Sequence, residues 1–286
     1  MEYPCEGSGD YRRTAVSVRD SRGVSGCDLR YVSHQVLPGK YGLPGMPAVY
    51  ADDTEAETLA VMLRDERLGL EVRLLYGVLP ALDAITRCAV ITNTGAAPLT
   101  LQNAASTCLD VLRGDLDRIV FWGKHTMERI PERRPVEHGE MTLGSRRGSS
   151  SHHMNPFTVR CEHEATETAG VALGVGLLWS GSFSGSVGLD SYGSTRLLLG
   201  IQDERFDYEL QPGEAFTAPE ALMVLSDEGL GGMSRRLHDV VRRHIVRGPW
   251  RDAERPVLIN NWEATYMNFT GDKLISIARQ AKELGV

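Results

Sequence analysis

The first three quarters of the chain alternate short apolar runs with turn residues. From about Tyr11 to Glu220 the hydrophobic residues come in brief groups rich in Val, Ile, Leu and Thr, with no sustained period of 3.6 residues. Examples of these predicted strands are residues 72–76, 84–91 and 195–199. Turn residues separate the runs, as at 93–98 and 211–213. Many strands at this spacing predict two large packed sheets, a mostly β fold of the sandwich type.

The pattern changes to a helical period after Pro219. Residues 232–246 place one apolar stripe along a predicted helix, made by Met233, Leu237, Val240, Val241 and His244. Ser234 is a suitable N-cap, and Gly248 followed by Pro249 ends the helix. The polar residues 251–256 then predict a linker, so we expect a domain boundary there.

The last thirty residues predict one strand and one helix. Residues 257–262 form an apolar run without alternation, which is typical of a strand buried on both faces of a parallel sheet. Thr270 is suited to cap a following helix, and Gly285 to end it. A parallel strand requires neighbours for its hydrogen bonds. We therefore expect the apolar side chains of residues 256–286 to be covered by the sandwich or by another chain.

Charge and cysteine content narrow the class of protein. The formal net charge of -7 gives no cationic field that would attract nucleic acid or an anionic membrane. Five scattered cysteines show no C-x-x-C spacing, so neither a zinc knuckle nor a disulfide framework is predicted. No apolar run reaches the roughly 20 residues of a membrane helix, and no leader follows Met1. We expect reduced thiols and a cytoplasmic location.

Several motifs resemble those of one enzyme family. PVLINNWEATY at 256–266 is similar to the opening barrel strand of the family 36 glycoside hydrolases, which are α-galactosidases. Further similar segments lie upstream, at 31–34, 38–40, 43–48, 85–87, 93–95, 147–157, 210–214 and 226–229. The resemblance therefore extends over nearly the whole chain.

The resemblance implies a particular architecture and activity. It implies a large two-sheet β-sandwich (supersandwich) at residues 1–230, a linker helix and connection at 231–255, and the first β-α unit of a (β/α)8 barrel at 256–286. The implied activity is retaining hydrolysis of terminal α-D-galactosides of the melibiose or raffinose type, with no cofactor and no metal. The family's sandwich also implies a homo-oligomer.

Two departures from the family pattern concern the ends of the chain. The family's leading sandwich strands come before the position of Met1, and its nucleophile and acid/base aspartates come after the position of Val286. Retaining hydrolysis needs two carboxyl groups about 5 to 5.5 Å apart. The resemblance therefore implies no catalytic residue within this chain, and we expect the isolated chain to be inactive.

Two tryptophans are the candidate substrate-binding residues. Trp262 follows the predicted barrel strand at the end where barrel enzymes place substrate, and an indole there can stack on a sugar. The resemblance implies that Trp262 lines the galactose pocket, and the alternative is a packing role. Trp122 resembles a family tryptophan that reaches the sugar from the sandwich, with core or interface packing as its alternative. We expect Asn260 and Asn261 to support the strand end.

Other polar groups favour structural roles. Asp52 and Asp53 are predicted to lie in a solvated turn, and Glu128 with Arg129 to form a structural ion pair. His152 and His153 are adjacent and lack the i, i+4 spacing of metal ligands on a helix, so a structural loop is preferred. The glycines at 170–176 run into a strand and do not open a helix, which excludes a dinucleotide fingerprint.

Two other functions stay open. The chain could be a carbohydrate-binding or oligomer-assembly module without catalysis, or part of an α-N-acetylgalactosaminidase. Nothing in these residues distinguishes the substituent at the sugar's 2-position.

Overall fold

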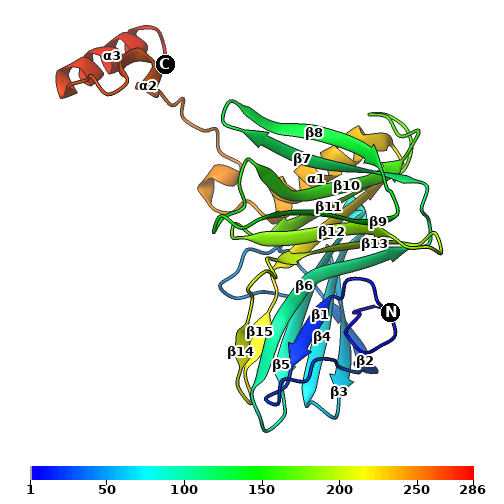
Figure 1. The fold of residues 1–286 in the computed structure, drawn as a ribbon. Coiled ribbons are helices and arrows are strands. Elements are labelled where there is room, and N and C mark those ends of the chain that lie inside the picture. The colour runs from blue at the N-terminus through cyan, green and yellow to red at the C-terminus, as the bar shows by residue number, and fades with distance from the viewer. Residues whose placement is uncertain (1) are drawn as a thin grey trace. The chain divides into compact units, whose positions relative to one another are not determined.

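The apolar runs of the first 226 residues form antiparallel strands in two sheets, as the sequence predicts. The structure is a computed structural model that describes residues 2–286, and it divides into one unit ending at Ile245 and a second at residues 246–286. This division falls inside the predicted connection at 231–255. The first unit is mostly β, and Figure 1 shows its sheets stacked face to face with helix α1 on the outside.

The larger sheet has ten strands, and its order is β2-β3-β4-β5-β16-β11-β10-β7-β8, with β15 beside β5. Their bounds are β2 Arg30–Pro38, β3 Glu57–Asp65, β4 Leu70–Leu79, β5 Ala84–Asn93, β7 Leu116–Lys124, β8 Met127–Pro135, β10 Met154–Glu162, β11 Ala172–Leu178, β15 Ala215–Thr217 and β16 Glu220–Ser226. A 3-10 turn at Pro80–Leu82 joins β4 to β5.

The smaller sheet runs β1-β6-β13-β12, with β14 also paired to β6 and β9 lying along β12. Their bounds are β1 Val16–Arg19, β6 Leu99–Val111, β9 Gly139–Ser145, β12 Phe183–Leu189, β13 Thr195–Ile201 and β14 Tyr208–Leu210. The long strand β6 is the centre of this sheet, because β1, β13 and β14 all pair with it.

Alternate residues of these segments are buried, which is the pattern of a strand with one face against a core. Leu70, Val72 and Leu74 of β4 are fully buried and share one face, while residues between them are less buried. Between the sheets they meet side chains from the smaller sheet, Leu101 among them. The buried apolar area is the main stabilising contribution of such a two-layer fold.

Helix α1, Gly229–His244, covers the outer face of the larger sheet and confirms the predicted helix. Met233 and Val240 are buried against strand residues that include Val159. A Cβ on Gly174 of β11 would lie 2.6 Å from the Met233 sulfur, so the glycine permits this close approach.

The predicted N-cap of α1 is wrong. The helix begins before Ser234, at Gly229, and the cap position has no side-chain hydrogen bond. Instead, the N–H groups of Leu230 and Gly231 donate to the carbonyls of Thr166 and Glu167, each at 2.9 Å. Because a distant loop satisfies the free donors of the first turn, the helix starts earlier than local signals indicate.

Residues 246–286 form three short helical segments: a 3-10 turn at Pro249–Arg251, α2 at Trp262–Thr265 and α3 at Gly271–Glu283. Helix α3 confirms the predicted helix: the Thr270 hydroxyl accepts a hydrogen bond from the N–H of Lys273, and Gly285 has a φ of 87°. No helix among residues 2–286 is long and apolar enough to cross a membrane.

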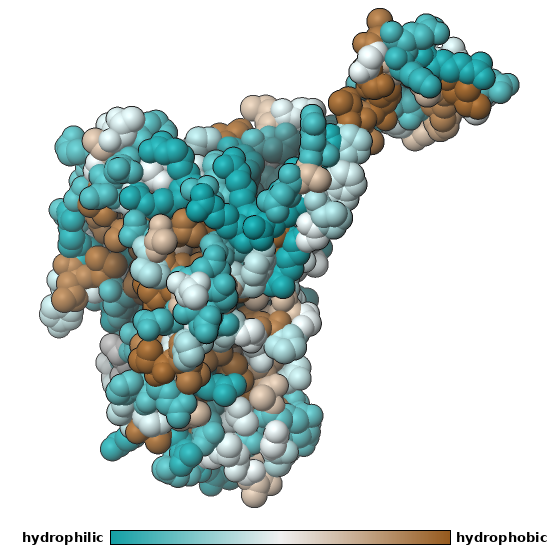
Figure 2. Space-filling model, turned by 180° about the vertical axis from the view of Figure 1, so that it is seen from behind, coloured by the Kyte–Doolittle hydropathy of each residue, from teal (hydrophilic) through white to brown (hydrophobic). Residues whose placement is uncertain are grey.

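The predicted strand at 257–262 is wrong for this chain. Residues 252–261 form neither helix nor strand, and Val257 and Leu258 are 75% and 88% exposed. A parallel strand needs at least one neighbouring strand for its hydrogen bonds, and the described residues supply none for this segment. The apolar side chains of this segment are exposed within their own unit, and Figure 2 shows apolar side chains at its surface. The expectation that the sandwich or another chain covers them stays a prediction.

Candidate functional site

Trp122 lies near the end of β7, between Ile130 of β8 and Met154 of β10. Its side chain is 39% exposed and belongs to none of the buried hydrophobic clusters of the described residues. A Cβ on the next residue, Gly123, would lie 2.3 Å from the Met127 carbonyl oxygen, so the β7–β8 hairpin closes tightly here. The indole therefore has a free surface that could contact another molecule.

A groove of about 470 Å³ lies between α1 and the larger sheet, and Arg129 of β8 is at its rim. Its walls are largely apolar and include Phe121, Phe157 and Leu237. No carboxylate is among the described residues that line it. Since glycoside hydrolysis requires paired carboxyl groups, this groove lacks the chemistry for catalysis.

Trp262 is the first residue of the short helix α2. Its N–H donates to the Asn260 side-chain oxygen at 2.8 Å, and the Asn261 amide donates to the Thr265 hydroxyl at 2.8 Å. Both asparagines thus hold the backbone around Trp262, although they support a helix start and not the predicted strand end. The indole stacks edge-on against Tyr266, with ring centroids 5.6 Å apart.

The Trp262–Tyr266 pair presents two aromatic rings to solvent, with exposed fractions of 45% and 57%. Such a pair, next to side-chain amides, suits the apolar face of a sugar and its hydroxyl groups. Trp122 belongs to the first unit and Trp262 to the second, so each is described in its own unit. Their roles as sugar contacts stay predictions.

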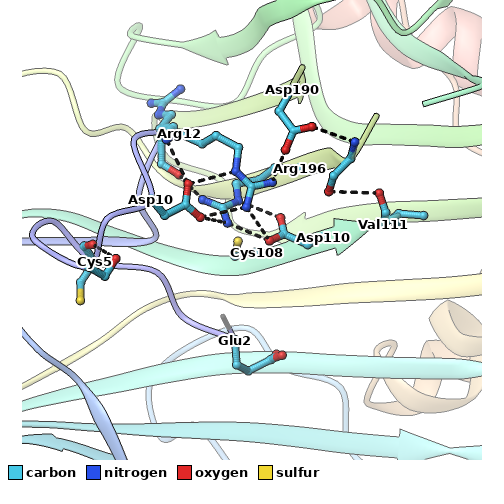
Figure 3. Close-up of polar contacts among 12 residues, drawn as sticks. Glu2, Cys5, Asp10, Arg12, Cys108, Asp110, Val111, Asp190 and Arg196 are labelled. Atoms are coloured by element: carbon cyan, nitrogen blue, oxygen red, sulfur yellow. Dashed lines mark hydrogen bonds and ion pairs between the residues drawn. The ribbon is translucent and has the colours of Figure 1, made fainter. Parts of the chain in front are cut away.

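A charged network that the sequence did not reveal joins the start of the chain to the smaller sheet (Figure 3). Arg196 of β13 donates to Asp10 and to Asp110 of β6, each at 2.7 Å. Arg12 is 2.9 Å from Asp10 and 3.3 Å from Asp190. The three carboxylates thus share two guanidinium groups.

The Asp10 carboxylate of this network is unsuited to acid catalysis. Hydrogen bonds from Arg12, and more weakly from Arg196, hold the pKa of Asp10 well below its usual range. A general acid needs a raised pKa, so that its proton is present at neutral pH. We assign the network a structural role, in which it fixes residues 10–12 against β6 and β13.

A second unpredicted pair, Lys40 and Glu220, is fully buried. The Lys40 ammonium lies 2.5 Å from one Glu220 oxygen, and the other oxygen accepts the N–H of Val49 at 2.6 Å. Burial raises the pKa of Glu220, and Lys40 opposes that rise. Because both carboxylate oxygens are occupied by these partners, Glu220 is not free to act on a substrate.

The remaining polar predictions have mixed outcomes. Asp52 and Asp53 lie in a loop before β3 and are exposed, which confirms the solvated turn. The predicted ion pair of Glu128 and Arg129 is wrong, because the Glu128 carboxylate instead accepts the N–H of Thr126 at 2.8 Å. Arg129 has a left-handed φ of 59°, and its side chain lines the groove between α1 and the larger sheet.

No cluster of metal-ligating side chains occurs in the part of the chain that the structure describes. The rings of His152 and His153 are 4.3 Å apart, and the His153 ring nitrogen meets Arg147 at 2.6 Å, in a loop before β10. No set of three or more His, Cys, Asp or Glu residues within 2–286 could hold a metal ion. All five cysteines are free and buried.

Comparison with known proteins identifies the family. Residues 1–211 match the glycosyl hydrolase family 36 N-terminal domain, and residues 215–286 match melibiase. The bifunctional α-galactosidase/sucrose kinase AgaSK of Mediterraneibacter gnavus is 46% identical over 100% of this chain and 31% of that protein. The α-galactosidase AgaA of Geobacillus stearothermophilus is 43% identical over 100% of this chain and 39% of that protein.

Solved structures agree in fold as well as sequence. The galactosidase domain of AgaSK has a TM-score of 0.97 at 46% identity, covering 100% of this chain and 40% of that one. An AgaA variant in complex with 1-deoxygalactonojirimycin has a TM-score of 0.98 at 42% identity, again over 100% and 40%. The chain thus spans 31% to 40% of the length of these relatives, and it belongs to glycoside hydrolase family 36.

Proposed function

We propose that this chain is part of a retaining α-galactosidase that hydrolyses terminal α-D-galactosides of the melibiose or raffinose type. The observation that carries the proposal is the match of the whole chain, at 43–46% identity, to proteins named α-galactosidases. AgaA variants have been solved with raffinose and with stachyose, which are α-galactosides of this class. The proposal includes a cytoplasmic location.

Trp262 and Trp122 are the proposed sugar contacts of the complete enzyme. The exposed Trp262–Tyr266 pair and the free indole face of Trp122 support this assignment. A sugar pocket needs several converging walls, and neither tryptophan has them within its own unit. The remaining walls would come from the part of the enzyme that the relatives contain outside the matched region.

We expect residues 1–286 alone to release no galactose. The carboxylates that the structure gathers, Asp10, Asp110, Asp190 and Glu220, are each held by Arg or Lys. Loss of the nucleophile and the general acid removes many orders of magnitude in rate.

The test uses the purified chain and a chimera. In the chimera, this chain replaces the matched part of Geobacillus AgaA, so that the rest of the enzyme is present. We expect release of nitrophenol from a nitrophenyl α-galactoside by the chimera and none by the chain alone. Enzyme-like turnover by the chain alone, abolished by changing one of its carboxylates, would show that residues 1–286 contain a catalytic residue and would contradict the proposal. A folded chimera that prefers the N-acetylgalactosaminide would favour the alternative activity.

A second candidate function is oligomer assembly through strand β2. This strand is at the edge of the larger sheet and is exposed along its whole length. Its exposed apolar side chains include Tyr31, at 60%, and Val36, at 62%. Long apolar edge strands tend to pair with another chain. Analytical ultracentrifugation of the chain and of Val36→Lys would test this, because self-association lost in the variant, without any response to galactose, would favour assembly.

A further inference from the structure

Two of the five cysteines lie against each other near the start of the chain. The Cys5 thiol donates to the Cys27 carbonyl at 3.0 Å, and the Cys27 N–H donates to the Glu6 carbonyl, also at 3.0 Å. The two thiols are within hydrogen-bonding reach of each other as well. The other three cysteines lie on three different strands, β5, β6 and β10. Cys5 and Cys27 are therefore the pair that the fold brings together.

The backbone on either side of the pair is built for close approach. Gly7 and Gly26 both have a positive φ, of 89° and 111°. A Cβ on Gly7 would lie 3.8 Å from the Gly26 Cα, and a Cβ on Gly26 would lie 3.5 Å from the Glu6 carbonyl oxygen. Glycine adopts these backbone angles without strain. The two segments thus run side by side because of their backbones, and the thiols meet as a consequence.

The contact makes Cys5 the more reactive of the five thiols. A hydrogen bond from the Cys27 thiol lowers the pKa of Cys5, whereas the same contact raises the pKa of Cys27. Burial raises the pKa of Cys88 to about 12 and that of Cys108 to about 11. The thiolate is the form that attacks a disulfide. Cys5 is therefore suited to attack an oxidant, with Cys27 next to it as the second thiol.

Short surface segments cover the pair. Cys5 and Cys27 are 1% and 4% exposed, so a reagent in solution reaches them only after local opening. A turn at residues 6–9 follows Cys5, and the exposed residues 21–25 come shortly before Cys27. Such segments open at a small fraction of the free energy of global unfolding. A small oxidant can thus reach the thiols while the sandwich stays folded.

We propose that Cys5 and Cys27 form a reversible disulfide when the protein meets a low-molecular-weight disulfide such as oxidised glutathione. The Cys5 thiolate attacks one sulfur of the oxidant, whose S–S bond breaks, and one glutathione thiolate leaves. The Cys27 sulfur then attacks the Cys5 sulfur of the mixed disulfide, and the second glutathione thiolate leaves. The protons of the two cysteines pass to the two leaving thiolates. The protein loses two electrons, and the oxidant becomes two thiols.

The cross-link fastens the start of the chain to the segment before β2. It joins two residues that are 22 positions apart, and the loop it closes contains β1 together with Asp10 and Arg12 of the charged network. Figure 3 shows Cys5 on the same N-terminal segment as Asp10 and Arg12. A disulfide stabilises a fold mainly by restricting the unfolded chain. The pair stays reduced where thiols are abundant and closes on oxidation.

The first test locates the cross-link by peptide mapping. The folded chain is incubated with reduced or oxidised glutathione, its remaining thiols are alkylated in denaturant, and it is digested with trypsin. Trypsin cleaves after Arg12, Arg22 and Arg30, so the cross-link joins peptide 1–12 to peptide 23–30. We expect this linked pair only after oxidation, with the other three cysteines alkylated. Its absence from the oxidised folded chain, or its formation only in urea, would overturn the proposal.

The second test measures what the cross-link does. Oxidation should raise Tm of the chain by about 5–10 °C, as expected for a disulfide that closes a loop of this length. Cys27→Ala should abolish both the linked peptides and the rise, and Cys161→Ala, which removes another buried thiol, should keep both. A linked chain with unchanged Tm would contradict the fastening of the N-terminal segment.

The mapping needs no variant, so it decides the question even if Cys27→Ala does not fold. Galactosidase activity is not a readout of either test. The disulfide and the proposed function can therefore fail independently.

Discussion

The two units of this chain differ in how completely their apolar residues are buried. In the unit that ends at Ile245, strands such as β4 and β5 have alternate side chains with no solvent exposure, including Leu74 and Ile91. In residues 246–286 the only buried side chain is that of Thr265, and Leu258 is 88% exposed. The first unit thus contains both sheets that enclose its core. In the second unit the apolar residues have no second layer to pack against.

The two units also differ in whether their secondary structure depends on nearby residues or on distant ones. Helix α3 forms because its cap and its helix-forming residues act within a few positions. The apolar run at 257–259 needs neighbouring strands, and without them it has no regular structure. Local signals therefore suffice for a helix, whereas a parallel strand depends on the rest of a barrel.

The largest effect on stability is expected at the buried pair of the first unit. Lys40→Met leaves the Glu220 carboxylate buried without its cation, which should cost about 3–5 kcal/mol in the free energy of unfolding. The exposed Lys282→Met in α3 is the matched control and should change it by less than about 0.5 kcal/mol. Denaturant unfolding followed by circular dichroism measures both. A loss below about 1 kcal/mol for Lys40→Met would show that the pair is solvated.

The loss of stability caused by Lys40→Met should depend on pH, and the pKa of Glu220 fixes the direction of that dependence. Burial raises the pKa of Glu220 above its unfolded value, so any stability linked to this group is present at low pH and declines as pH rises through the folded pKa. Removing Lys40 takes away the charge that opposes that rise. The destabilisation by Lys40→Met should therefore be larger at neutral than at acidic pH, and Lys40→Met with Glu220→Gln should recover most of the loss. A loss that does not change with pH would contradict this assignment.

One substitution made in both units tests their difference directly. Ile91→Ala in β5 removes a fully buried side chain and should cost about 2–5 kcal/mol. Ile275→Ala in α3 removes a side chain that is 50% exposed and should leave the main unfolding transition unchanged within about 0.5 kcal/mol. Equal losses at both sites would mean that residues 246–286 are covered in solution.

The aromatic pair of the second unit should matter only when the rest of the enzyme is present. In the AgaA chimera, Trp262→Ala should reduce transition-state binding by on the order of 1 to 3 kcal/mol, as expected for the loss of a well-placed aromatic contact. Trp250→Ala, also an exposed tryptophan of this unit, is the control. The measurement is kcat/KM on a nitrophenyl α-galactoside. Unchanged kinetics would assign Trp262 a structural role.

The fold was predictable from sequence to the extent that its signals are local. Short apolar runs between turn residues predicted strands at 84–91 and 195–199, and the structure has β5 and β13 there. The start of α1 was missed, because its first N–H groups bond to a loop more than sixty residues earlier in the chain, at Thr166 and Glu167.

The charged clusters were beyond prediction for the same reason. Lys40 and Glu220 are 180 residues apart, and Asp10 and Arg196 are 186 apart, so no motif contains either pair. Trp122 was identified only by family resemblance. Trp262 was identified by that resemblance together with a predicted strand end that the structure does not form. Family membership thus supplied the candidate site, and the structure supplied the partners of its charged groups.

The smallest expected effect tests whether α3 depends only on its own residues. The Thr270 hydroxyl accepts the N–H of Lys273 at 3.3 Å, and Thr270→Ala should cost about 1 kcal/mol of helix stability, the usual value of an N-cap. Because no side chain of α3 is buried, the loss should appear as faster hydrogen exchange in its first turn, and the sandwich transition should not move. Ser276→Ala, an exposed change within the same helix, should not increase exchange, since alanine is the better helix former. If Thr270→Ala also lowers the sandwich transition, the two units are coupled in solution, and the contrast between them is weaker than their burial indicates.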